Sequence, residues 1–250
     1  MTPRQLSQRA RAEFRESADP RVAEGQRAYF KKWEKVHFHG LKTPEQRRIE
    51  RTLYHEVREQ WTFVEAVELC EELMPDRYLE SKGLALTLLA RFHRRFERGL
   101  LRRAKGWLER GFCDNWAVTD QLSTQILSRL IEKFEPLAAT VESWDKSPNL
   151  WVRRACAVSF VKAAARGRHL DRVYRIVTVL EPDTQDLIHK ACGWLLREAG
   201  KGDPARLERH LSVRGPAIPR TTMRYAIERF PEQKRKQILE DTRVAGRKRL

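Results

Sequence analysis

The sequence lacks the patterns that mark several common kinds of binding site. No GxGxxG or GxxxxGK[ST] loop occurs, which argues against nucleotide binding of those types, and no GxSxG nucleophile elbow occurs. No apolar run approaches the roughly 20 residues that span a bilayer. The first 14 residues are polar and charged, without the features of a secretory signal. We therefore expect a cytoplasmic protein that does not act at a membrane.

Metal and redox sites are also poorly represented. The chain has four cysteines, and the closest two, Cys156 and Cys192, are 36 positions apart, so no CxxC zinc spacing exists. Each cysteine lies among apolar neighbours, which indicates a small buried side chain in a reducing compartment. His37 and His39 resemble half of a metal site, but no cysteine or carboxylate cluster accompanies them at helical spacing. We expect no metal and no cofactor.

The charge balance is strongly positive. Lys and Arg number 50 against 34 Asp and Glu, giving a formal net charge of +16 and a pI near 10.1. Hydrophobic residues make up 41% of the chain, which is enough for a folded core. A polyanionic partner follows: nucleic acid is favoured over an anionic membrane surface. A helix-rich surface that is merely well solvated remains an alternative, because Arg is common on exposed helices.

Helical periodicity runs through nearly the whole chain. The apolar pattern and the turn signals between segments predict early helices over 4–16, 20–36, 44–58, 61–73 and 80–96. Short helices joined by short loops are typical of stacked helical hairpins, an all-α solenoid. We expect a single domain over 1–240, a basic tail over 241–250 and a monomer.

A predicted helix over 184–200 places a tryptophan among cations. On a wheel of 100° per residue, Trp194 shares one stripe with Lys190, Arg197 and, if the helix continues, Lys201. The core-facing side is apolar and comprises Ile188, Ala191, Cys192, Leu195, Leu196 and Ala199. The stripe could face a polyanion. Equally, Trp194 could pack against a neighbouring helix beneath the Lys and Arg stems.

A second basic segment covers residues 147–169. Ser147 and Pro148 predict a helix start, with serine as cap and proline in the first turn. Arg153, Arg154 and Lys162 follow, and forked guanidinium groups suit phosphate oxygens. A solvated basic face is the alternative interpretation.

The stretch GFCDNWAVTD, residues 111–120, holds a carboxylate one helical turn after an indole. Gly111 ends one predicted helix, and Asp114 or Asn115 can cap the next. Trp116 and Asp120 then project from one face. Val118 and Leu122 point to the opposite side.

Five segments together resemble one known family, over roughly residues 20–230. They are AYFKKWEKVHFHGLKTPEQRR at 28–48, NWAVTD at 115–120, NLWVRRACAVSF at 149–160, LIHKACGWLLREAGKGDP at 187–204 and PRTTMRYAIERF at 219–230. In this order they are similar to the AlkD-like glycosylases of the DNA alkylation repair family. The resemblance implies a HEAT-like α-solenoid of antiparallel helix pairs that cradles duplex DNA in a basic concave face.

The resemblance also implies an activity and its residues. Proteins of this kind release positively charged N3- and N7-alkylated purines from duplex DNA by hydrolysis of the N-glycosidic bond, without a metal. It implies a catalytic aspartate at Asp120, with Trp116 and Trp194 lining the site. It further implies DNA-backbone contacts at Arg154, Lys162, Arg197 and Tyr29, beside the Arg153, Lys190 and Lys201 of the basic segments. The implied setting is the nucleoid of a bacterial cytoplasm.

The chemistry of such lesions explains one carboxylate in a basic protein. A cationic purine is already a good leaving group and needs no general acid. Positive charge then develops on the deoxyribose, and a fixed carboxylate can stabilise it and orient the attacking water. Indole faces also favour nearby cations. Two alternatives stay open: a non-catalytic HEAT-like protein that binds damaged or branched DNA, and a protein-interaction scaffold with incidental charge.

Overall fold

The computed structural model describes residues 1–243, and every regular element within them is helical apart from one isolated β-bridge between His37 and Tyr78. By its internal contacts the chain divides into an N-terminal unit, Met1–Glu135, and a C-terminal unit that begins at Pro136. Most of the predicted tail, residues 244–250, lies outside the described residues. No described helix is both long enough and apolar enough to cross a membrane. The single domain expected over 1–240 stays a prediction.

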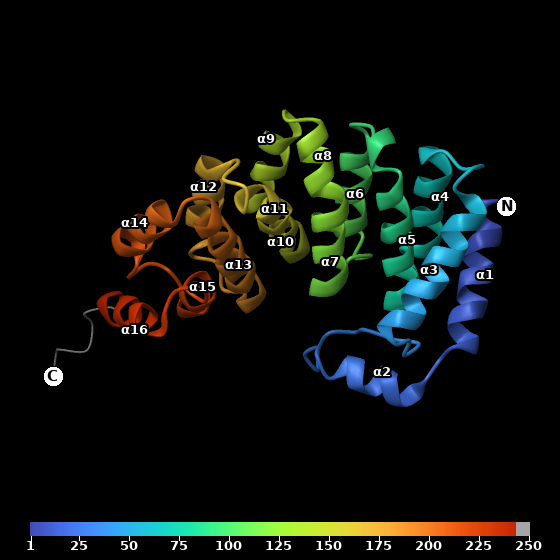
Figure 1. The fold of residues 1–250 in the computed structure, drawn as a ribbon, viewed down its shortest axis with the longest axis horizontal. Coiled ribbons are helices and arrows are strands. Elements are labelled where there is room, and N and C mark those ends of the chain that lie inside the picture. The colour runs from blue at the N-terminus through green and yellow to red at the C-terminus, as the bar shows by residue number, and fades with distance from the viewer. Residues whose placement is uncertain (244–250) are drawn as a thin grey trace. The chain divides into compact units, whose positions relative to one another are not determined.

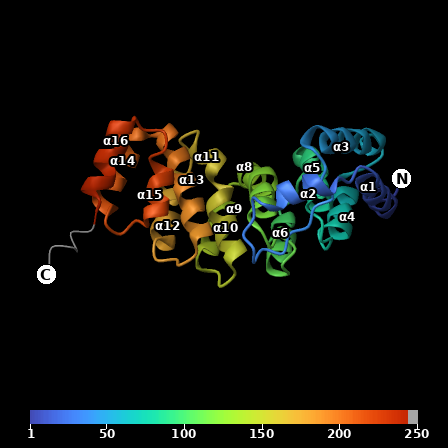
Figure 2. The same ribbon diagram turned by 90° about the horizontal axis from the view of Figure 1, so that it is seen from below.

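The N-terminal unit is built from helices that pack side by side. Helix α5 contacts α3, α4 and α7, and α1 contacts α4. Figure 2 shows α3 and α5 in one layer and α4 and α6 in the other. The core between them includes the fully buried rings of Phe14 and Trp107. The helices are α1 (Pro3–Glu16), α2 (Pro20–Arg27), α3 (Thr43–Val57), α4 (Phe63–Leu73), α5 (Leu79–Arg91), α6 (Leu100–Glu109), α7 (Trp116–Leu122) and α8 (Ser128–Lys133).

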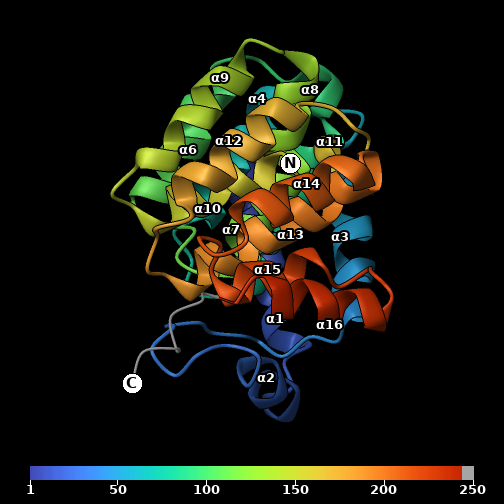
Figure 3. The ribbon, with the colours of Figure 1, turned by 90° about the vertical axis from the view of Figure 1, so that its left-hand side faces the viewer.

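The C-terminal unit is organised around one long helix, α13. It contacts α10, α11, α12, α14 and α15, and Figure 3 shows it between α14 and α15. The helices are α9 (Leu137–Glu142), α10 (Leu150–Ser159), α11 (Val161–Ala164), α12 (Leu170–Leu180), α13 (Asp186–Gly202), α14 (Pro204–Arg214), α15 (Arg220–Ala226) and α16 (Glu232–Asp241). Layered helices in both units confirm the predicted all-α solenoid class.

Several helix boundaries follow directly from local sequence. Thr2 and Gln5 form a capping box at the start of α1, and Thr62 and Glu65 form another at the start of α4. Each box satisfies backbone N–H groups that lack a partner in the first helical turn. The helices predicted over 4–16, 44–58 and 61–73 are therefore confirmed to within two residues at each end.

The helix predicted over 20–36 is wrong beyond Arg27, where α2 ends. The Arg27 guanidinium donates hydrogen bonds to backbone carbonyls of the following residues, among them those of Phe30 at 3.2 Å and Glu34 at 2.8 Å. These carbonyls therefore accept hydrogen bonds from a side chain and do not continue the backbone hydrogen bonds of α2. The chain continues as a loop to α3, and Figure 1 shows this loop extending towards the start of α7. Tertiary contacts thus override the helical pattern of the sequence.

The helix predicted over 80–96 also ends early, at Arg91, and a 3₁₀ turn over His93–Arg95 follows. Side chains of α8 bind the freed carbonyls: Arg129 donates to Ala90 O at 2.6 Å, and Lys133 donates to Arg94 O at 2.7 Å. These bonds satisfy the end of α5 and fix α8 against it.

The start predicted at Ser147 is wrong by two residues. Ser147 is extended and closes a 3₁₀ turn over Ser143–Lys146, and its hydroxyl accepts the N–H of Asn149 at 3.2 Å. Asn149 is the cap of α10, because its side-chain oxygen accepts the N–H of Trp151 at 2.8 Å. The proline therefore precedes the helix instead of opening it.

Candidate functional site

Helix α7 fixes the Trp116–Asp120 pair at the edge of the N-terminal core. The Asn115 side chain accepts the N–H of Val118 at 3.1 Å, which confirms one of the two caps expected from the sequence. Val118 and Leu122 are 2% and 0% exposed, so one face of α7 is locked into the core. Trp116 and Asp120, i and i+4 on the same helix, are both partly exposed. The predicted separation of the two faces is confirmed.

The helix widens three residues after Asp120, where α7 ends. A π-helical turn over Ser123–Leu127 joins α7 to α8. The hydroxyls of Thr124 and Ser128 donate to the carbonyls of Asp120 and Thr124 at 2.7 and 2.6 Å. Such back-bonds compete with the α-helical ladder, and π turns are frequent at functional sites. The hydroxyl residues at 123, 124 and 128 are the sequence feature that corresponds to this turn, and helical periodicity alone does not reveal it.

Trp116 is held by aromatic packing that the sequence did not predict. Its ring stacks on Phe30, with centroids 4.9 Å apart and planes at 18°, and Phe30 in turn contacts Phe38 at 5.6 Å. Both phenylalanines come from the loop between α2 and α3. Stacking fixes the orientation of the indole, which a ring lining a reaction site needs. The clustered aromatics at 29–38 were the available signal.

A polar pocket of about 150 Å³ lies beside α7. Three glutamines line it, Gln26, Gln46 and Gln121, together with the buried carboxylate of Glu80. Gln121 follows Asp120 on α7 and donates to the carbonyl of Gly83 at 2.9 Å. This bond ties the residue beside the candidate carboxylate to α5 and so limits its movement.

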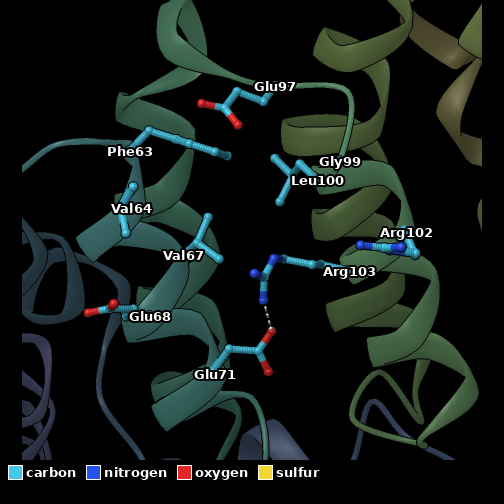
Figure 4. Close-up of a pocket in the computed structure, with 10 residues that line it drawn as sticks. All are labelled: Phe63, Val64, Val67, Glu68, Glu71, Glu97, Gly99, Leu100, Arg102 and Arg103. Carbon is cyan, nitrogen blue, oxygen red and sulfur yellow. Dashed lines mark ion pairs between the residues drawn. The ribbon is translucent and has the colours of Figure 1, made fainter.

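A larger pocket of about 280 Å³ lies between α4 and α6, away from the predicted residues (Figure 4). Its walls carry three carboxylates, Glu68, Glu71 and Glu97, and Arg103 pairs with Glu71 at 3.5 Å. Two arginines, Arg102 and Arg103, also line the pocket but only partly offset the three carboxylates, so the lining does not favour a polyanion. None of the residues proposed from the sequence lines this pocket, so it is not the candidate site.

In the C-terminal unit, Trp194 lies on the side of α13 that the helical wheel predicts. Leu195 and Leu196 are fully buried, whereas Trp194 is partly exposed. Gly193 has a structural role next to it: a Cβ at this position would lie 2.4 Å from the Cβ of Tyr225 on α15. The glycine therefore permits the close approach of α13 and α15 directly beside the indole.

The cations of the α13 stripe have acidic neighbours. Lys190 pairs with Asp186 at 2.8 Å, and both Arg197 and Lys201 contact the buried carboxylate of Glu198. The helix does continue to Lys201, as the stripe requires. DNA phosphates would have to share these cations with carboxylates already in contact with them. Their role in DNA binding stays a prediction.

The basic residues of α10 and α11 differ in their surroundings. Arg153 pairs with Asp183 at 2.7 Å. Arg154 is 5% exposed and donates to the carbonyl of Leu187, joining α10 to α13. Lys162 is exposed on α11. Of the three, Lys162 is the most open to solvent, and the DNA contacts proposed for all three stay predictions.

The predicted site residues fall into two groups. Tyr29, which is 81% exposed, belongs to the N-terminal unit together with Trp116 and Asp120. Trp194 and the predicted cations belong to the C-terminal unit. That the two groups form one site stays a prediction.

The histidine pair and the cysteines have structural surroundings. His39 stacks on Tyr78 with centroids 3.7 Å apart, and burial lowers the pKa of this histidine. All four cysteines are buried and unbridged, as expected. Burial raises the pKa of the Cys113 and Cys192 thiols to about 12, so neither is a nucleophile near neutral pH. No group of three or more His, Cys, Asp or Glu side chains within residues 1–243 is arranged to hold a metal ion.

Comparison with known proteins agrees with this architecture. The fold is an all-α solenoid, and a family model described as DNA alkylation repair enzyme matches residues 10–230. The chain therefore belongs to the DNA alkylation repair enzyme family, which gives it a role in DNA alkylation repair. The resemblance found in the sequence is confirmed.

A solved structure shows the same fold. The chain is similar to a predicted DNA alkylation repair enzyme from Enterococcus faecalis, with a TM-score of 0.74 and 17% sequence identity over 86% of this chain and 98% of that one. A search of curated proteins gave no match. At this identity the structural likeness supports the fold, while the activity rests on the family and on the residues described above.

Proposed function

We propose that this protein is a DNA glycosylase that hydrolyses the N-glycosidic bond of positively charged N3- and N7-alkylated purines in duplex DNA. One observation carries the proposal. In a family of alkylation repair enzymes, a chain of net charge +16 presents the carboxylate of Asp120 one turn from Trp116, on a helix whose other face is locked in the core. The proposed enzyme is a monomer and carries out one step, base release.

The chemistry follows from the lesion. When the bond between C1′ and the purine breaks, the bonding electrons leave with the base and neutralise its charge. The sugar becomes an oxocarbenium-like cation, which the Asp120 carboxylate stabilises. Water oriented by the same carboxylate adds to C1′ and loses a proton, leaving an abasic site. The Trp116 ring, fixed by Phe30, favours cationic groups at its face.

The C-terminal unit supplies the second part of the proposal. Trp194 lines the site from α13, and the cations of α10, α11 and α13 bind the DNA backbone. Guanidinium and ammonium groups neutralise phosphates without reading sequence, which suits an enzyme whose lesions occur in any context. The carboxylates that contact Arg153, Lys190, Arg197 and Lys201 keep these four cations in place before DNA arrives.

Incubation of the purified protein with duplex DNA that contains one N7-methylguanine tests the proposal. Release of free 7-methylguanine, with a matching yield of abasic sites, is the expected result. Salt-dependent duplex binding without release would contradict the enzymatic proposal and favour the non-catalytic DNA-binding alternative. Absence of both would favour a protein-interaction scaffold.

A further inference from the structure

The loop between α2 and α3 displays two large aromatic side chains to solvent. Tyr29 is 81% exposed and Trp33 is 62% exposed. Large aromatic side chains usually bury most of their surface in a folded domain, although single exposed ones are common. Two within five residues on one loop form an exposed apolar surface, and such surfaces mark contacts with another molecule.

The segment 28–35, here called the 28–35 loop, is held in shape from the inside. The Arg27 guanidinium donates to the carbonyls of Phe30, Lys31, Lys32 and Glu34 at 3.2, 3.0, 3.2 and 2.8 Å. The Glu34 side chain is 3% exposed and accepts the N–H of Lys31 at 2.8 Å. These bonds fix the backbone of the loop. The two rings are therefore exposed on an ordered segment.

The region is also anchored at both ends. Phe30 stacks on Trp116 of α7. Further along, Gly40 has φ of +88°, and a Cβ there would lie 2.0 Å from the carbonyl oxygen of Asp19 at the start of α2. The His37 carbonyl accepts the N–H of Leu79 at 3.0 Å. The loop is therefore a rigid element beside the Trp116–Asp120 pair, and it can present side chains at fixed positions.

The outward face of the loop is positive. Lys31, Lys32 and Lys35 are exposed, while the one carboxylate of the segment, on Glu34, is turned inwards and buried. Aromatic platforms interleaved with cations are the arrangement that binds unstacked nucleic-acid bases, because the rings stack on bases and the cations track the phosphates. Stacking on a base requires that the base has left its own stack, as happens where a duplex is damaged.

We propose that the 28–35 loop is a second DNA contact, in which Trp33 stacks on an unstacked base of a damaged duplex and the three lysines neutralise the adjacent phosphates. This inference rests on the proposed function for its ligand, DNA, but not on catalysis by Asp120. The loop adds recognition of distorted DNA, including the abasic product, to phosphate contacts that do not distinguish damaged from intact duplex.

Equilibrium binding of the full chain to two duplexes of one sequence tests this. One duplex is fully paired, and the other carries a tetrahydrofuran abasic analogue. Trp33→Ala should weaken binding to the abasic duplex by about 5- to 150-fold, the range of one lost base–aromatic stack, and leave the paired duplex nearly unchanged. Trp33→Phe should retain most of the affinity, because a ring remains. Val213→Ala, which trims a side chain 79% exposed in the C-terminal unit, is the matched control and should change neither affinity.

Lysine variants test the other half of the proposal. Lys32→Ala should weaken binding to both duplexes alike and reduce the slope of log K against log salt by about 0.9, the value for one phosphate contact in B-DNA.

An equal loss of affinity for both duplexes in Trp33→Ala, or equally weak binding by Trp33→Phe and Trp33→Ala, would overturn the stacking role. Unchanged DNA binding with lost binding to phosphatidylglycerol vesicles would assign the loop to membranes instead.

The outcome is separable from that of base release. If the parental protein releases no 7-methylguanine but Trp33→Ala loses affinity for the abasic duplex, the loop proposal stands and the glycosylase proposal fails. If release occurs and Trp33→Ala binds both duplexes like the parent, the loop proposal fails alone.

Discussion

The two tryptophan-bearing helices are built in opposite ways. Helix α7 in the N-terminal unit has seven residues, begins at Trp116 and gives way to a π turn soon after Asp120. Helix α13 in the C-terminal unit has 17 residues, packs against α10, α11, α12, α14 and α15, and carries Trp194 near its middle. The first helix presents a carboxylate beside an indole, and the second surrounds its indole with cations. The difference separates the tasks proposed for the two helices: α7 stabilises developing positive charge, and α13 binds negative phosphates.

The cations of α13 also illustrate what holds the C-terminal unit together. Glu198 is 6% exposed. It is contacted by Arg197 and Lys201 of α13 and by Arg229, which follows α15. A buried carboxylate is tolerated only when cations and hydrogen bonds compensate it. These side chains therefore stabilise the unit in addition to any contact with DNA. The described ring contact of Trp116 is instead aromatic: its indole stacks on Phe30, which in turn contacts Phe38.

A pair of glycine substitutions should separate the packing of the two units most strongly. Gly193→Ala puts a Cβ 2.4 Å from the Tyr225 Cβ and 2.7 Å from Thr222 O, so it should cost about 1–3 kcal/mol of unfolding free energy. Gly106→Ala in α6 meets nothing within 4 Å and should instead stabilise by about 0.4–1 kcal/mol. Urea unfolding of both variants measures the two free energies. Equal and small effects would contradict the close α13–α15 approach.

Truncation of each tryptophan should compare the two proposed walls of the site. Trp116→Ala and Trp194→Ala should each slow release of 7-methylguanine by about 2- to 30-fold, the range of one cation–π contact. Because both rings are partly exposed, the loss of stability should stay below the roughly 3–5 kcal/mol of a fully buried tryptophan. Single-turnover rates and melting temperatures are the two measurements. A large thermal loss with a normal rate per folded molecule would remove that ring from the site.

The sequence predicts features that depend on residues close together in the chain, and it misses features that depend on residues far apart in the chain. Leu195, Leu196 and Trp194 lie as predicted because a helical period of 3.6 residues decides which side faces the core. The Asn115 cap is likewise local. The loop after α2 is held by bonds from Arg27 to nearby carbonyls and also by the long-range stack of Phe30 on Trp116, and no local pattern reveals that stack.

The charge partners were missed for the same reason. A helical wheel places Arg197 and Lys201 on a face, but it cannot show that the backbone brings both to Glu198. Arg154 looked like a phosphate ligand by residue type, and its burial against the Leu187 carbonyl depends on how α10 packs on α13. The catalytic role proposed for Asp120 rests on the family resemblance, and the structure adds the Asn115 cap, the π turn and the aromatic stack on the same helix.

Salt titrations should compare an exposed cation with one that carboxylates contact. Lys162→Ala removes an exposed lysine, so the slope of log K against log salt should shrink by about 0.9 if it binds one phosphate. Arg197→Ala should shrink the slope by less, since Glu198 and Glu228 already share this guanidinium. Arg154→Ala is the third variant in the series. Unchanged slopes for all three would place DNA away from the basic residues of the C-terminal unit.

The smallest expected effect concerns one histidine in each unit. Burial lowers the pKa of both His39 and His210 below 6.5, so the folded state prefers neutral rings. Their contribution to the free energy of unfolding is then fully present above pH 6.5 and is lost as the pH drops below that value, because the unfolded chain takes up the protons first. His39→Gln and His210→Gln should each make urea midpoints less sensitive to pH between 8 and 5. A parental midpoint that rises on acidification would contradict this sign.

The central claim is that one carboxylate on α7 performs the chemistry, and one comparison of rates tests it. Asp120→Asn keeps the shape of the side chain and removes its charge. Asp114→Asn is the matched control, because it removes a carboxylate six residues earlier that contacts Lys82 at 3.7 Å. In single-turnover assays on duplex DNA with one N7-methylguanine, Asp120→Asn should be slower by about 10²–10³-fold, the typical loss for one preorganised electrostatic group. Asp114→Asn should release base at the parental rate. Base release by Asp120→Asn at the parental rate would contradict the account.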